Sequence, residues 1–166
     1  ALLFGVAVTA SFVGMTSTRK NYLVLLFYTI AVFIIQVICL FYLGMDTTWK
    51  LYPLLAHLPM IVFSALYLKR PWLISVISMF TAFLCCQPPR WIGSMVGEIY
   101  ISVGGNFFEK ATINHLGYIV SVVLMYFILK KYVAKSVRHL MERSTKSCMI
   151  FGAVPFFYYF VDHATT

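Results

Sequence analysis

The chain has little charge and very few acidic residues. Asp, Glu, Lys and Arg make up 11% of its 166 residues, and only 5 acids stand against 13 basic residues, which gives a formal net charge of +8. Soluble domains usually carry about 25% charged residues. With 61% hydrophobic residues and a mean hydropathy of +0.88, this composition indicates an integral membrane protein.

The patterns that mark catalytic, metal or nucleic-acid sites are missing as well. The histidines lie in different segments, and no His-x-x-x-His, Cys-x-x-Cys or His-Glu-x-x-His pattern occurs. The sequence has no Ser/His/Asp grouping, P-loop or nucleic-acid motif, and no long polar stretch that could fold as a catalytic domain. We therefore expect no catalytic residue, metal, cofactor or nucleic-acid partner here. The positive charge is assigned to contact with the lipid bilayer.

Long apolar runs, by contrast, cover most of the chain. An outer-membrane barrel needs alternating apolar and polar residues over strands of roughly 10 residues, whereas residues 23–43 are apolar almost throughout. The spans are therefore expected to be helices. The apolar runs are residues 1–15, 22–43, 51–68, 72–86, 92–108, 116–129 and 148–161. The first is short for a membrane core of about 30 Å, so we expect that helix to be truncated in this numbering.

The Lys and Arg residues between the runs predict the topology, because cytoplasmic loops are enriched in them. If residues 92–108 do not cross the membrane, ten of the thirteen basic residues share one side: Arg19, Lys20, Lys69, Arg70, Lys130, Lys131, Lys135, Arg138, Arg143 and Lys146. If that run does cross, the dense block at residues 130–146 moves to the opposite side. The first arrangement predicts an all-α polytopic transmembrane bundle of about six spanning helices, with both ends of the chain outside. The block at residues 130–146 is then a cytoplasmic helix against anionic lipid.

The composition of residues 92–108 agrees with this topology. The run contains Glu98, and a charge near the bilayer centre costs about 2.5 kcal/mol or more. It also contains several glycines, of which Gly93 and Gly97 have the small-xxx-small spacing that permits close helix approach. We predict a non-spanning re-entrant or interfacial segment on the outer side.

Residues 85–91, Cys-Cys-Gln-Pro-Pro-Arg-Trp, form the most unusual local sequence. Two consecutive prolines cannot lie in a helix interior, so a helix must end here. Arg90 can hold a carboxylate through two hydrogen bonds, and Trp91 offers a flat amphipathic surface. The alternative is that Trp91 is an interfacial anchor and Arg90 contacts a lipid headgroup. Cys85 and Cys86, together with Cys39, are expected to be free thiols.

Two other features have two interpretations each. Glu98 is the one carboxylate inside an apolar run, which makes it a candidate ligand contact or proton-linked switch, or else an exposed residue on a surface helix. Pro53 and Pro59 interrupt the third run on either side of His57, and broken helices of this kind line cavities or pack as kinks.

Two stretches resemble a known family. The first stretch is residues 83–93, Phe-Leu-Cys-Cys-Gln-Pro-Pro-Arg-Trp-Ile-Gly. The second is residues 151–160, Phe-Gly-Ala-Val-Pro-Phe-Phe-Tyr-Tyr-Phe, followed by Asp162-His163-Ala164-Thr165-Thr166. They look like the membrane sensor region of Firmicutes histidine kinases with GHKL-type ATPase domains, which are related to the accessory-gene-regulator peptide receptors. Helix order and basic inner loops across essentially the whole chain are compatible with that family.

The resemblance implies a multi-pass protein of the bacterial cell membrane that binds an extracellular ligand, often a peptide. It implies a signal passed to a cytoplasmic histidine kinase, as in two-component quorum sensing, and a homodimer. In that family a last helix, a coiled coil and an ATPase domain follow the sensor, so this chain is expected to be one transmembrane domain, residues 1–166, of a longer protein. The full-length protein would then be the kinase.

If the chain is such a receptor, we expect its ligand pocket at the outer leaflet. The residues that would form it are Gln87, Arg90, Trp91, Glu98 and Asp162. The family's ligand contacts do not form a fixed motif, so these residues are chosen from their chemistry and expected position.

A small six-helix transport protein, such as the substrate-binding subunit of a vitamin transporter, is the alternative. Its usual size matches the 19.0 kDa of this chain. The small residues Gly5, Ala7, Ala10 and Gly14 could then dock a partner helix. A purely structural membrane subunit is a third possibility. Translation of the gene past Thr166 distinguishes the receptor from the others.

Overall fold

The computed structural model describes residues 2–164, without the side chain of Trp49, so Ala1, Thr165 and Thr166 of the sequence lie outside the described residues. All its elements are helices: α1 (Leu2–Val13), α2 (Arg19–Tyr52), the π-helical turn η1 (Pro53–His57), α3 (Leu58–Leu66), α4 (Trp72–Cys85), α5 (Gln87–Ser102), α6 (Phe107–Ile128), the π-helical turn η2 (Leu129–Val133), α7 (Ala134–Arg143) and α8 (Thr145–Ala164). The predicted all-α class is confirmed.

Three helical stretches are long and apolar enough to cross a membrane: Arg19–Thr48, Trp72–Ser102 and Phe107–Arg143. Two shorter apolar helices, Leu2–Val13 and Lys50–Leu66, accompany them. Gly44 lies within the first long stretch and kinks α2 there, because its backbone (φ 78°, ψ 173°) departs from helical geometry. The number of membrane crossings stays a prediction.

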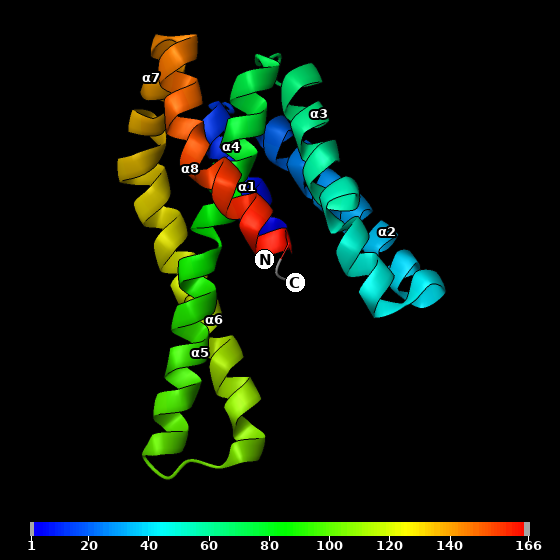
Figure 1. Cartoon of the computed structure of the whole chain (residues 1–166), viewed down its shortest axis with the longest axis vertical. Helices are drawn as coiled ribbons and strands as arrows, with labels where there is room; N and C mark the ends of the chain where they lie inside the picture. The colour runs from blue at the N-terminus through cyan, green and yellow to red at the C-terminus, as the bar shows by residue number, and fades with distance from the viewer. Residues whose placement is uncertain (1, 165–166) are drawn as a thin grey trace.

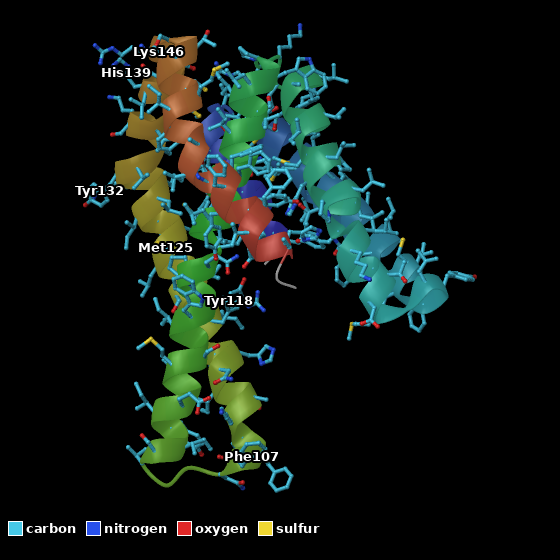
Figure 2. All side chains as sticks on the ribbon, in the orientation of Figure 1. Phe107, Tyr118, Met125, Tyr132, His139 and Lys146 are labelled. Atoms are coloured by element: carbon cyan, nitrogen blue, oxygen red, sulfur yellow. The ribbon has the colours of Figure 1, made fainter. Side chains whose placement is uncertain are left out.

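Three connections gather at one end of the molecule, here called the basic end: residues 14–18, 67–71 and 144 (Figure 1). Arg70 links them, because its guanidinium donates to the Glu142 carboxylate at 3.1 Å and to the Gly14 carbonyl at 3.4 Å. His139 and Lys146 also lie there, whereas Phe107 lies at the opposite end (Figure 2). The basic connections that the charge distribution groups together are thus close in space.

The first helix is the centre of the bundle. Phe12 and Val13 have no exposed surface and Val8 only 1%, and Phe12 and Val8 share one core cluster with Ile77 of α4 and Met141 of α7. The small residues of α1 are also used inside the chain. Ala10 is 1% exposed, Gly5 faces the Cys86 thiol, and Gly14 faces two arginines. Gly5 and Ala7 are only half-buried, so whether this stripe also docks a partner helix, as the transport alternative expects, stays a prediction.

Helix α4 ends at Cys85, as the two prolines require, but the chain does not turn away. Only Cys86 separates it from α5, and Cys86 has nearly helical dihedrals (φ −77°, ψ −18°). Proline in the first turn of a helix is tolerated because its missing N–H would have no partner there. Helix α5 therefore continues beyond α4 in the same general direction (Figure 1).

The run predicted as a re-entrant or interfacial segment, residues 92–108, is the far part of a helical hairpin. It consists of most of α5, a turn at Gly104 (φ 90°) and the start of α6. Helix α4 has 14 residues, which rise only about 21 Å, so it needs part of α5 to match a membrane core of about 30 Å. Whether the run crosses a membrane stays a prediction.

Glycines allow α5 and α6 of the hairpin to pack closely against each other. A Cβ atom at Gly93 would lie 2.8 Å from the backbone oxygen of Asn114 and 3.0 Å from the Tyr118 Cβ, and one at Gly97 would overlap the Asn114 amide. Gly117 of α6 lies against Val96 in turn. The small-xxx-small spacing thus allows close approach of the two helices, as predicted, and the partner is the chain's own α6.

Candidate functional site

The C-terminal part of α8 packs on the end of α4 just before the Cys86 junction, where Phe83 contacts both Tyr158 and Tyr159. Tyr158 of α8 lies close enough to both Arg90 and Asp162 to interact electrostatically with each. Tyr118 of α6 is within the same range of Arg90 and Cys86. We call Arg90, Tyr158 and Asp162 the rim cluster. It offers a cation, an anion and a phenol on two helices that start far apart in the sequence.

A second group of side chains lies next to the rim cluster and deeper in the bundle. His57 Nδ1 and the Tyr159 hydroxyl are 2.8 Å apart, and the two rings meet at a centroid distance of 5.3 Å. The His57 ring also contacts Phe83 edge-on at 5.5 Å, and Tyr159 packs on Phe80 at 4.8 Å. We call His57, Phe80, Phe83 and Tyr159 the histidine cluster. Since Tyr158 and Tyr159 are adjacent, the two clusters are joined through α8.

The proline pair around His57 explains why that side chain reaches α8. Pro59 has no N–H for the helical bond to the residue four before it, and the backbone takes a π-helical turn from Pro53 to His57, closed by Leu58 donating to the Pro53 carbonyl. The His57 ring is enclosed by aromatic rings and a hydroxyl. Of the two interpretations of this break, the structure favours the packed kink.

The predicted site residues are only partly gathered. Arg90 and Asp162 are both within electrostatic range of Tyr158, and Gln87 is buried with 6% of its surface exposed at the start of α5. Trp91 is 57% exposed and points away from the buried core. Glu98 lies about 12 Å farther along α5 than Arg90, at 1.5 Å per residue. Its carboxylate pairs with Lys110 at 2.5 Å.

The rim and histidine clusters include residues that sequence reasoning missed. Tyr158 and Tyr159 belong to an aromatic run, and all five residues from Phe156 to Phe160 are aromatic. Helical periodicity shows that these aromatic residues lie on several faces of α8. It does not show which of those faces packs on α4. His57 alone carried a signal, through the prolines on either side of it.

Cysteine chemistry contributes nothing further to this site. All four cysteines are free thiols, and Cys148 is buried. Within residues 2–164 no three His, Cys, Asp or Glu side chains are grouped as metal ligands.

Two cavities lie at the basic end, away from the rim cluster. One of about 440 Å³ is lined by residues from the α1–α2 and α3–α4 connections, and one of about 550 Å³ lies between α4, α7 and α8. Arg70 lines both.

The rim cluster can recognise a zwitterionic molecule. A guanidinium binds a carboxylate, a carboxylate binds an amine, and Tyr158 adds an aromatic face and a hydroxyl. Comparisons with protein-family models, with curated proteins and with solved structures find no match to this chain. Its function is therefore inferred from its own residues.

Proposed function

We propose that this chain is a membrane receptor module that detects an extracellular ligand of peptide character. The signal passes to a cytoplasmic histidine kinase region beyond this chain, in a protein of the bacterial cell membrane that works as a homodimer. The observation that carries the proposal is that Arg90 and Asp162, from different helices, are both within electrostatic range of Tyr158. A peptide provides both of the charges that this pair would bind.

Helix α8 provides a route for the signal. Asp162, a member of the rim cluster, lies near the C-terminal end of α8, and the first residue of α8, Thr145, lies at the basic end. Between them α8 packs tightly on α4, because a Cβ at Gly152 would lie 2.6 Å from the Ile77 side chain. A ligand that prefers one packing of α8 on α4 would shift the population of that packing. The shift would then reach the basic end, on the side of the membrane where the kinase would lie.

The test uses the full gene product in membrane vesicles, with kinase autophosphorylation as the readout. The stimulus is cell-free spent medium, applied with and without prior protease digestion. We expect Arg90→Ala and Asp162→Asn to abolish a protease-sensitive response. Glu98→Gln is the matched control, because it changes an acidic residue of the same hairpin outside the rim cluster, and it should respond normally.

Unchanged responses in both Arg90→Ala and Asp162→Asn would remove the rim cluster as the ligand site. Translation of the gene past Thr166 provides an independent test of the receptor role. A further span followed by a coiled coil and an ATPase domain supports it, whereas a stop codon soon after Thr166 excludes it and returns the transport alternative.

A further inference from the structure

Two arginines from distant parts of the sequence converge on the end of α1. A Cβ atom at Gly14 would lie 2.6 Å from Arg138 Nη1 and 3.0 Å from Arg70 Nη2. Because both nitrogens are this close to one point, they are within about 5.6 Å of each other, the most that these two distances allow. Gly14 itself has φ +82°, so its lack of a side chain is required both by the backbone and by the two guanidinium groups.

The charges of this pair are incompletely balanced. Arg70 pairs with Glu142 at 3.1 Å, and both side chains are only partly exposed, at 32% and 44%. Arg138 is half-buried, and within residues 2–164 it forms no ion pair with a carboxylate. Two guanidinium groups this close repel each other. A bound anion would offset that repulsion and use the guanidinium donors that remain.

The cavities on the two sides of Arg70 differ in chemistry. The cavity of about 440 Å³ is lined by Thr16, Asn21 and Lys69, among others, and offers several hydrogen-bond donors. The cavity of about 550 Å³ is lined largely by apolar side chains, including Leu73, Met141 and Cys148. A small anion such as inorganic phosphate would use only the polar cavity. A lipid has a polar headgroup and an apolar chain, so it fits both.

We propose that Arg70 and Arg138 bind the phosphate group of an anionic phospholipid, with the headgroup in the polar cavity and part of an acyl chain in the apolar one. Basic pockets between helices at the cytoplasmic face are known to bind such headgroups. The proposal agrees with the high density of Lys and Arg at this end. It does not depend on the receptor role or on the identity of the extracellular ligand.

The experiment titrates the full chain in zwitterionic detergent with short-chain phosphatidylglycerol, and counts bound lipid by native mass spectrometry. Phosphatidylcholine and inorganic phosphate are titrated in parallel. Salt is kept high enough to screen exposed charges. We expect one tightly bound phosphatidylglycerol, weaker phosphatidylcholine, and inorganic phosphate weaker still. Arg138→Gln should weaken phosphatidylglycerol about tenfold, as expected for loss of a charge-assisted hydrogen bond.

Arg143→Gln is the matched control, because Arg143 is an exposed arginine of the same helix α7, whereas Arg138 is half-buried and lies against Gly14 beside Arg70. It removes the same charge and should change binding by less than about twofold. If Arg138→Gln fails to fold, as judged by circular dichroism, Arg138→Lys replaces it. That variant keeps the charge but loses the planar two-donor geometry, so binding should still weaken.

Equal effects of the Arg138 and Arg143 variants would overturn the site and leave only a basic surface. Inorganic phosphate binding as tightly as phosphatidylglycerol would overturn the assignment to lipid.

Discussion

The bundle around α1 and the α5–α6 hairpin both consist largely of apolar residues, but they bury these residues to very different extents. In the bundle, Phe12 and Val8 are almost completely enclosed by α4, α7 and their neighbours. In the hairpin, the buried residues of α5 are Gln87 and Pro89 at its start and Gly93 and Gly97 further on, whereas large side chains such as Met95 and Ile99 are 61% and 57% exposed. Side-chain interlocking holds the first region together, and close backbone approach holds the second.

This difference teaches which parts of the chain need an apolar surrounding. In the apolar part of the long stretch Phe107–Arg143, only 11% of the residues are buried inside the structure. In that of Trp72–Ser102 the buried share is 56%. Exposed apolar surface on this scale is typical of a surface that contacts a membrane or another protein. The proposed membrane provides the missing contacts for α2 and α6, and the core around α1 does not need it.

The largest effect is expected from emptying the core of the bundle. Phe12→Ala removes a fully enclosed ring and should lower the free energy of unfolding by about 3–5 kcal/mol. Phe108→Ala is the matched control at the hairpin tip, where the ring is 89% exposed, and it should change stability by less than about 0.5 kcal/mol. Equilibrium unfolding in mixed micelles, followed by circular dichroism, measures both. Similar losses in the two variants would contradict the contrast between core and hairpin.

A smaller and local effect is expected from widening the hairpin. Gly97→Leu places a side chain where the Asn114 amide lies, and overpacking of this kind costs about 1–3 kcal/mol. The distance between spin labels on Met95 and Leu116 should increase, in a chain whose four cysteines are replaced by serine. Ser94→Leu is the control, since Ser94 is exposed on the same helix. An unchanged distance in Gly97→Leu would mean that the glycines do not set the separation of α5 and α6.

Local rules predicted much of this fold, because the decisive signals lie close together in the sequence. Apolar runs predicted helices, the Lys and Arg distribution predicted the grouping of the connections, and the Gly93 and Gly97 spacing predicted a close helix contact. The identity of the partner helix could not be predicted, because a glycine pair has no side chain that selects Asn114 and Tyr118.

The candidate site was only partly predictable, for a geometric reason. The prolines suggested that the chain changes course near Arg90, which would have folded Glu98 back toward Asp162. Because the prolines lie in the first turn of α5, they do not interrupt this helix, and Glu98 lies farther along it, away from the rim cluster. Tyr158 and Tyr159 were missed because the rotation of α8 about its axis depends on packing with α4, including the contact of Gly152 with Ile77.

The smallest effect is expected from the charges of the hairpin. Glu98 and Lys110 pair at 2.5 Å, but the Glu98 side chain is 67% exposed, and exposed ion pairs contribute only about 0.2–1 kcal/mol. Glu98→Gln should therefore lower stability by less than Gly97→Leu does, and the loss should shrink further as salt is added. Unfolding of the two variants at low and high salt compares the two contributions. If Glu98→Gln cost more than Gly97→Leu, charge rather than close backbone packing would hold the hairpin closed. The contrast with the bundle would then be between ionic and apolar packing, and the exposed apolar side chains of α5 and α6 would need another explanation.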